Sequence, residues 1–424
     1  MRIIADLHIH SKYSRATSKD MEVDTLAHWA ELKGINLLAT ADFTHPAYFA
    51  ELKEKLKPSG NGLFVLKKDK SPESEKDVHF ILSTEVNNIY HQGGKLRKIH
   101  NIIFAPNFEM AEKINQRLSK LGNLSSDGRP VFTFSAKELA KIILNISEEC
   151  LIVPAHAWTP WFSIFGANSG FDSIEECFDE YSKNIFSIET GLSSDPPMNW
   201  RLSRLDKITL ISNSDAHSPS KIGREANVFD CEMSYYEIID AIKKKDKKRF
   251  LFTIEFFPQE GKYHFDGHRN CGVLSSPEES KKNKNLCPVC HRKLTVGVMS
   301  RVEELSDRPE GFIPPNAISY KNLIPLIEIV AGALNQGVET KACENEYKRL
   351  VQTFGNEFLI LLDLPISELS GKAPAKIVEG IKKTREGDVK IVPGYDGVYG
   401  KISLFGEEEK VEEKAKEEGQ IELF

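Results

Sequence analysis

Short apolar runs alternate with amphipathic stretches along the first 255 residues, and this alternation constrains the fold more than any other feature of the sequence. Apolar runs of roughly 4–8 residues indicate strands, whereas longer stretches with a period near ~3.6 residues indicate helices. The expected strands are residues 2–5, 35–39, 79–84, 100–105, 151–154, 185–189, 208–212 and 251–255. The expected helices are residues 23–33, 108–121, 135–145, 172–183 and 234–245. Strands and helices that alternate in this way predict an α/β fold with a β/α sheet or barrel.

Histidines and carboxylates stand at the ends of these expected strands, where the chemistry of β/α barrels gathers. In Asp6-x-His8-x-His10 the strand period of two puts the side chains on one face, so two imidazoles can bind one metal ion. Asp215-x-His217 repeats this arrangement after another strand. A lone strand-end His or Asp is most often a cap or a surface residue, but two such pairs predict a metal site. Further strand-end donors are Asp42, Glu85, His156 and Glu189.

His100 differs from these donors because it begins its apolar run instead of ending it. Residues 79–84 and 100–105 are separated by a polar loop that contains Gly93 and Gly94. If the two strands pair antiparallel, the start of the second lies beside the end of the first. We therefore expect His100 to face Glu85.

Taken together, these motifs resemble those of the polymerase-and-histidinol-phosphatase (PHP) family of metal-dependent hydrolases. The matching segments are residues 6–11, 34–42, 85, 100–103, 156 and 214–217. The resemblance implies a distorted seven-stranded β/α barrel that holds up to three ions, with zinc, manganese or iron usual and magnesium an alternative. It implies that His8, His10, Glu85 and Asp215 hold one ion, that Glu85, His100 and His156 hold a second, and that Asp42 and His217 contribute to a third.

The chain departs from the PHP pattern at the third site. Phe43 stands where many PHP proteins carry a histidine, and His45, two residues later, is the candidate replacement. Clustered cations bring the pKa of a bound water towards ~7 and neutralise charge on a phosphate, so phosphoester hydrolysis is the expected chemistry. Asp195, on a proline-stiffened loop after residues 185–189, is our candidate catalytic residue, as a ligand or an orienter of the water; a simple turn residue is the alternative.

A second metal site is expected in residues 256–300, where histidine, cysteine, glycine and basic residues replace the apolar runs. Cys287 and Cys290 form a C-x-x-C pair, and His268 with Cys271 forms an H-x-x-C pair. Two close ligand pairs are what a tetrahedral structural zinc requires. His264 and His291 are rivals for the fourth position.

This cysteine-rich segment and several loops resemble the endonuclease Q family over essentially the whole chain. The matching motifs lie at residues 42–46, 158–161, 261–271, 294–298, 302–308 and 393–400. The resemblance implies a DNA repair enzyme that nicks on the 5′ side of uracil, hypoxanthine, xanthine or an abasic site. Enzymes that inspect a base usually flip it into a pocket with aromatic walls. The candidates for base or DNA contact are Trp158, Trp161 and Phe162, with Phe165 beside them; ordinary packing is the alternative.

The C-terminal tail is acidic, with eight Glu and three Lys in residues 407–424, and we expect it to be disordered. The tail accounts for −5 of the formal charge of −6, so the rest of the chain is almost neutral. This balance, together with local basic runs, is compatible with a DNA partner. Two short segments resemble shortened motifs that bind the sliding clamp of replication. Their expected clamp-binding residues are Leu404, Phe405, Gln420, Leu423 and Phe424.

We expect four parts: a PHP barrel over residues 1–255, a zinc module over 256–300, a helical DNA-binding domain over 301–400 and a flexible tail over 401–424. No apolar run approaches the roughly 20 residues of a membrane span, so we expect a cytoplasmic, nucleoid-associated protein with no membrane partner. The abundance of Lys and Glu is typical of thermophiles. The rival functions are a histidinol-phosphatase-like enzyme for small molecules and a non-catalytic DNA-binding scaffold.

Overall fold

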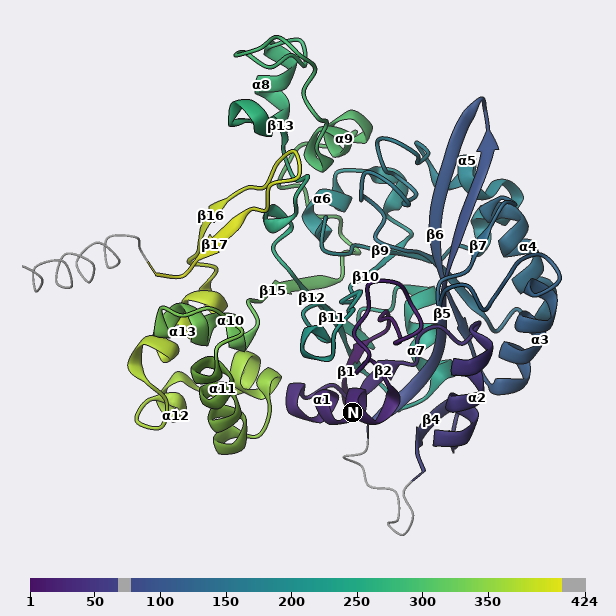
Figure 1. Cartoon of the computed structure of the whole chain (residues 1–424), viewed down its shortest axis with the longest axis horizontal. Coiled ribbons are helices and arrows are strands. Elements are labelled where there is room, and N and C mark those ends of the chain that lie inside the picture. Colours follow the sequence, from purple (N-terminus) through teal and green to yellow (C-terminus); the bar gives the residue numbers. More distant parts are fainter. Residues whose placement is uncertain (68–77, 406–424) are drawn as a thin grey trace, which may run out of the picture.

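A computed structural model describes residues 1–67 and 78–405 of the chain. Figure 1 shows three parts: a large α/β part that carries β1 to β12, a small module that carries β13, α8 and α9, and a bundle of helices α10 to α13. A hairpin of β16 and β17 runs from the helical bundle towards the small module (Figure 1). Within the described residues, no helix is both long and apolar enough to cross a membrane.

The main sheet of the α/β part has eleven strands and mixed direction. These strands are β1 (Arg2–Asp6), β2 (Leu37–Ala39), β3 (Leu56–Gly60), β4 (Leu63–Leu66), β5 (His79–Gln92), β6 (Lys95–Ala105), β7 (Val131–Phe132), β8 (Leu151–Pro154), β11 (Ala226–Asp230), β12 (Phe250–Glu255) and β15 (Ser319–Asn322). A separate parallel pair consists of β9 (Ser187–Glu189) and β10 (Thr209–Ile211). The eight strands expected from the sequence are all present, and β5 and β6 are longer than expected.

The parallel neighbours β1, β2 and β5 form the centre of the sheet, and β6 folds back antiparallel on β5. β8 then pairs with β6, while β11 pairs with the other edge of β1. Other hydrogen bonds connect this sheet with β9 and β10. Ala157, which follows β8, donates its N–H to the Glu189 carbonyl in β9. The side-chain amide of Asn227 in β11 bonds to the backbone N–H and carbonyl of Ser212, the residue after β10. The described ladders leave gaps between β8 and β9 and between β10 and β11, so backbone pairing alone does not close the expected seven-stranded barrel.

Helices pack around this sheet and begin at sequence-encoded caps. Asn107 and Ser135 accept backbone N–H bonds at the starts of α3 and α4, and Gly34 ends α1 in the left-handed region at φ 85°. The helices of the α/β part are α1 (Val23–Lys33), α2 (Pro46–Lys55), α3 (Phe108–Leu118), α4 (Ala136–Ile146), α5 (Ile174–Phe178), α6 (Pro196–Trp200) and α7 (Tyr235–Lys244). Short 3-10 turns cover Asp179–Asn184, Ser203–Leu205, Pro219–Lys221, Pro258–Glu260 and Arg269–Cys271.

The small module contains the hairpin β13 (Asp266–His268) and β14 (Val273–Ser275), with α8 (Pro277–Lys282) and α9 (Val298–Leu305) after it. Ser276 and Glu279 form a capping box at the start of α8. The glycine-rich segment of residues 393–400 joins this module, because Phe265 donates its N–H to the Gly394 carbonyl at 3.0 Å. The segment that connects β16 (Lys390–Val392) and β17 (Lys401–Ser403) therefore packs against the small module, although it lies far from it in the sequence.

The helical bundle consists of α10 (Leu326–Leu334), α11 (Lys341–Phe354), α12 (Ile366–Leu369) and α13 (Ala375–Glu386), with a π turn at Leu359–Asp363. A buried ion pair joins the bundle to the α/β part: Lys33 at the end of α1 lies 2.8 Å from Glu357. The Glu357 carboxylate also accepts bonds from the Tyr347 hydroxyl and the Leu326 N–H. These three contacts satisfy the buried Glu357 carboxylate, and the contact with Lys33 fixes the bundle against α1.

Candidate active site

The strand-end histidines and carboxylates converge on one region of the α/β part. His8 and His10 follow β1, and Asp215 and His217 follow β10. An isolated β-bridge between Ile9 and Ala216 holds these two segments side by side. Glu85 lies in β5, His100 in β6 and His156 directly after β8, so five separate strands supply the cluster.

Glu85 is the shared member of two groups of potential metal ligands, one with His8 and His10 and the other with His100 and His156. Its Oε1 lies 2.7 Å from His100 Nδ1 and 3.2 Å from His156 Nε2, and its Oε2 lies 3.5 Å from His10 Nε2. In β5 and β6 His100 stands opposite Asn87, two residues beyond Glu85. The antiparallel pairing expected from the sequence therefore brings His100 onto Glu85.

A third group joins His10, Asp215 and His217. Asp215 Oδ1 lies 3.0 Å from His10 Nε2 and 3.8 Å from His217 Nδ1. His10 and Asp215 therefore link this group to the two that share Glu85, and the three groups form one continuous centre.

Several of these donors are buried without a hydrogen-bond partner among the described residues. These atoms are Nε2 of His8, His10 and His100, and Oδ1 of Asp42 and Asp215. Leaving a buried polar atom unpaired costs free energy, so such a set is expected where the missing partner is a ligand. Imidazole nitrogens with carboxylate oxygens suit zinc, iron or manganese, and the residues therefore fit the expected metal ions.

Charges at the centre shift the pKa values of its members strongly. Burial alone would lower the pKa of His10, but the Asp215 and Asp42 carboxylates outweigh it and raise the pKa to about 10. Burial likewise opposes Glu189, which raises the pKa of His8 to about 9. For Glu85, burial is outweighed by His100 and Arg129, which hold its pKa well below the usual range. His8, His10 and the neighbouring carboxylates thus stabilise one another's charged forms, whereas burial lowers the pKa of His100 to about 4.

Two carboxylates orient the histidines from behind. Glu189 accepts from His8 Nδ1 at 3.0 Å and from the His156 N–H at 2.7 Å. Asp42 Oδ2 accepts from the Ser11 N–H and the Ser14 hydroxyl, while its Oδ1 lies 3.5 Å from His10 Nδ1. Such partners fix which imidazole nitrogen faces the metal. The structure therefore places Asp42, predicted to contribute to the third ion, behind His10.

Backbone strain marks the same region. Asp42, His156 and Asp215 have φ angles of 39°, 31° and 47°, in the left-handed region that residues other than glycine rarely adopt. Strain of this kind persists only where the surroundings enforce it, and it gathers at functional sites.

Two other candidates lie away from the cluster. Asp195 caps α6 by accepting the Met198 N–H at 3.1 Å, and burial raises its pKa to about 6. None of the three donor groups found in the described residues includes it. His45 caps α2, its ring centroid lies 4.3 Å from that of Tyr13, and it belongs to none of the donor groups found in the described residues.

The aromatic loop after His156 divides into a buried and an exposed half. Trp158 is 1% exposed and donates its indole N–H to Asn199, so it packs in the core and cannot line a base pocket as predicted. Trp161 is 41% exposed, and its ring lies 5.7 Å from Tyr263 of the small module. The Phe162 ring lies 5.0 Å from His100. Arg301 in α9 holds the loop by donating to the Phe165 and Phe171 carbonyls.

The second predicted site is also assembled. Ligand atoms of His268, Cys271, Cys287 and Cys290 all lie within 4.8 Å of one another. His264 and His291, the rivals for the fourth position, lie outside this group. Burial raises the pKa of the Cys271 thiol to about 11; for Cys287, burial opposes backbone N–H bonds from Cys290 and Val289, which lower its pKa to about 6.

Sequence reasoning missed Arg129 and gave Glu189 no role. Arg129 Nη1 lies 3.1 Å from Glu85 Oε2. Glu189 carried a signal, since it ends an expected strand. Arg129 lies in the long loop between α3 and β7, where nothing in the local pattern relates it to Glu85.

Comparisons with known proteins find several relatives of the chain. A family model described as the MJ0043 C-terminal domain matches residues 325–388. The uncharacterized protein MJ0043 of Methanocaldococcus jannaschii is 36% identical over 257 residues, and the chain spans only 31% of its length. The uncharacterized protein YqxK of Bacillus subtilis is 29% identical over 412 residues, covering 95% of this chain and 99% of that one.

Two solved structures are similar over nearly the whole chain. One is the lesion-specific endonuclease PfuEndoQ from Pyrococcus furiosus, with 32% identity, a TM-score of 0.83 and coverage of 95% of both chains. The other is endonuclease Q in complex with a 27-mer duplex that has an abasic lesion at the active site. It shows 32% identity and a TM-score of 0.81, and covers 96% of this chain and 98% of that one.

The fold and its clustered histidine and carboxylate donors define a metal-dependent phosphodiesterase. More narrowly, the chain belongs to the endonuclease Q family, as the resemblance in the sequence indicated.

Proposed function

We propose that the chain is a DNA repair endonuclease that hydrolyses the phosphodiester on the 5′ side of deaminated bases and abasic sites. The observation that carries the proposal is the continuous centre in which Glu85, His10 and Asp215 link three donor groups. The proposal is supported by a relative, endonuclease Q, which binds a 27-mer duplex with an abasic lesion at its own active site. The proposed substrates are uracil, hypoxanthine, xanthine and abasic sites in duplex DNA.

The chain's own residues prepare the site for this chemistry. Metal ions bound there would activate a water and neutralise the phosphate. We propose His8, His10, Glu85 and Asp215 as ligands of one ion, Glu85, His100 and His156 as ligands of a second, and His217 at a third, with Asp42 orienting His10 from behind instead of binding the third ion directly. Glu189 keeps His8 turned towards the centre through Nδ1.

We propose that the exposed half of the aromatic loop, which carries Trp161 and Phe162, recognises the damaged base. Phe162 borders His100, and Trp161 extends the aromatic surface to Tyr263. A flipped base needs such a wall next to the reacting phosphate. Trp158 supports the loop from the core and takes no direct part.

A substrate panel tests the proposal. Labelled duplexes with one uracil, one hypoxanthine or one abasic site are compared with an undamaged duplex and a phosphomonoester. Incision confined to the damaged duplexes, directly 5′ of the lesion, is expected. Turnover of the phosphomonoester alone would favour the small-molecule phosphatase, and tight DNA binding without any cleavage would favour the scaffold.

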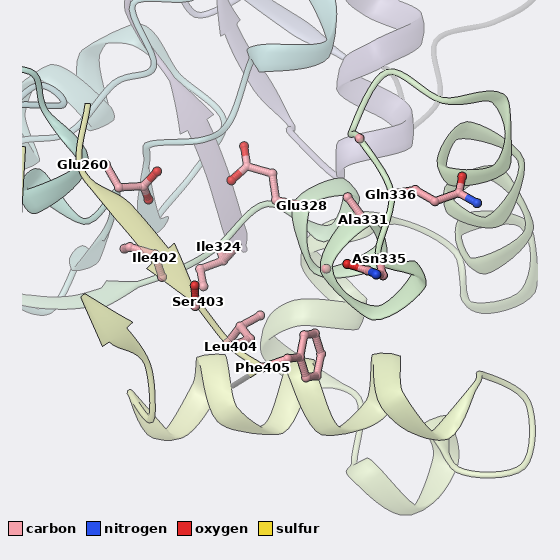
Figure 2. Close-up of a pocket in the computed structure, with 12 residues that line it drawn as sticks. Glu260, Ile324, Glu328, Ala331, Asn335, Gln336, Ile402, Ser403, Leu404 and Phe405 are labelled. Carbon is pink, nitrogen blue, oxygen red and sulfur yellow. The ribbon is translucent and has the colours of Figure 1, made fainter. Parts of the chain in front are cut away.

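We propose that the sliding clamp binds only the C-terminal end of the tail. Gln420, Leu423 and Phe424 lie outside the described residues. Figure 2 shows Leu404 and Phe405 against the helices of the bundle, and Ile324 and Ala331 line the same pocket. Phe405 also lies over Lys376, with Nζ 5.2 Å from the ring centroid. A truncation after residue 405 should abolish clamp binding in a pull-down. If binding survives, Leu404 and Phe405 would be the clamp-binding residues instead.

A further inference from the structure

Arg129 stands on a loop that is anchored to the first metal-binding motif. The Gly128 N–H bonds to the Tyr13 carbonyl at 3.0 Å, and the Thr44 hydroxyl bonds to the Gly128 carbonyl at 3.4 Å. A Cβ on Gly128 would collide with the Asp42 carboxylate and the Ser14 hydroxyl. The close approach that glycine allows therefore sets Arg129 directly beside the centre.

The guanidinium of Arg129 faces the shared carboxylate and leaves most of its donors free for another partner. Nη1 bonds to Glu85 Oε2 at 3.1 Å, and within the described residues this is the only hydrogen bond of the side chain. The side chain is 23% exposed, whereas Glu85 is 1% exposed. Arginine carries five N–H donors and never loses its charge in proteins, so the remaining donors point to an anionic ligand.

Electrostatics identify that ligand. Glu85 is the carboxylate proposed to join two divalent cations, and bound cations would compete with Arg129 for its negative charge. The Glu85 carboxylate raises the pKa of Arg129 and outweighs burial, which lowers it, so the guanidinium stays charged. The planar fork of a guanidinium matches two oxygens of a phosphate, so a phosphate bound at the centre would be a second anionic partner for Arg129.

We propose that Arg129 contacts the non-bridging oxygens of the scissile phosphate and stabilises the negative charge that develops there during hydrolysis. The inference rests on the proposed function. Arg129 would then be a catalytic residue that binds no metal ion. Its bond to Glu85 would be the position of the side chain in the absence of DNA.

The test compares Arg129→Gln with Arg129→Lys and with a matched control, Arg15→Gln. Arg15 is 83% exposed and pairs with Asp127, whose other oxygen accepts the Arg129 backbone N–H, so this variant controls for loss of a nearby arginine and for disturbance of the loop. Single-turnover incision of a uracil duplex is measured over a range of enzyme concentrations, with metal content and melting temperature of each preparation. We expect Arg129→Gln to lower the incision rate by at least about 100-fold, as loss of one transition-state donor does. Arg129→Lys should keep part of the rate, and Arg15→Gln all of it.

A second duplex separates contact with the phosphate from support of Glu85. Its scissile linkage is an uncharged methylphosphonate, and its affinity for each protein is measured by fluorescence anisotropy. If Arg129 meets the phosphate charge, wild type and Arg129→Gln bind this duplex equally, although they differ on the charged one. Equal weakening on both duplexes, or metal loss from Arg129→Gln, would overturn the inference, as would incision within about 3-fold of wild type. Failure of the wild type itself to incise would overturn the proposed function, and the inference with it.

Discussion

Individual residues carry most of the functional argument, and the sequence predicted them unevenly. His8, His10 and Asp215 could be placed because strand period and strand ends are local properties. Arg129 could not, because its partner Glu85 lies 44 residues away in a different element. Trp158 illustrates the converse: its position beside His156 suggested a base contact, but neighbouring apolar residues bury its ring.

Replacement of Asp215 by Asn should remove metal from the centre without unfolding the protein. The neutral amide is a poorer ligand and no longer stabilises the charge of His10. We expect metal analysis to show the loss of at least one ion per chain, with the melting temperature almost unchanged. Asp20→Asn, at an exposed position, is the control. Full metal content in Asp215→Asn would mean that Asp215 is not a ligand.

Asp195→Asn separates the two interpretations of that residue. As a helix cap, Asn replaces Asp at almost no cost in stability. If Asp195 serves only as the cap of α6, incision by Asp195→Asn should stay close to that of wild type. A loss of about 100-fold at unchanged stability would restore the catalytic role predicted from the sequence.

Two carboxylates buried beneath the site, Glu225 and Glu255, should make stability depend on pH. Burial raises the pKa of Glu255 from 4.5 to about 8, and that of Glu225 well above its ordinary value. A raised carboxyl pKa means that the folded protein binds the proton more tightly. This stabilisation is fully present below pH 4.5 and is lost as pH rises to about 8.

Glu255→Gln mimics the protonated acid and does not titrate. We expect the melting temperature of this variant to exceed that of wild type by a margin that grows between pH 5 and pH 8.5. A difference that stays constant across this range, or that shrinks with rising pH, would contradict the account.

At the scale of elements, alternation of strands and helices predicted the first 255 residues in part. The strands β3, β4, β7 and β11 and the helices α2 and α6 were not expected, and the expected helix over residues 172–183 is divided into α5 and a 3-10 turn. All eight expected strands and the helices α1, α3, α4 and α7 lie within a few residues of their expected positions. The short strand β15 was missed, because Ser319–Asn322 is polar and partly exposed and gains its strand conformation only by pairing with β12. Tertiary pairing of this kind leaves no periodic signal in the sequence.

The small module should depend on its metal for stability. Removing one ligand of a structural zinc costs part of a binding free energy that is on the order of 10 kcal/mol in isolated zinc peptides. Cys287→Ser should therefore lose about one zinc per chain and melt at a lower temperature, whereas Cys231→Ser, a buried cysteine outside the ligand group, should keep its zinc. Retention of the full zinc content by Cys287→Ser would exclude the site.

At the scale of the whole molecule, the sequence predicted four successive parts, but packing joins segments across the predicted boundaries. Residues 393–400 pack with the small module, and β15 completes the main sheet. α9 holds the aromatic loop through Arg301. The loop proposed to read the base is therefore supported by two parts of the chain at once, and length or composition alone does not show such contacts.

The central claim is that this centre cuts DNA beside a damaged base, and incision of a duplex with a single uracil tests it most directly. The metal-free protein, prepared by chelation, is compared with protein to which zinc, manganese or magnesium is restored. We predict one nick, directly 5′ of the uracil, that requires added metal and is absent from the undamaged duplex. Equal cutting of the two duplexes, or full activity after complete removal of metal, would contradict the account.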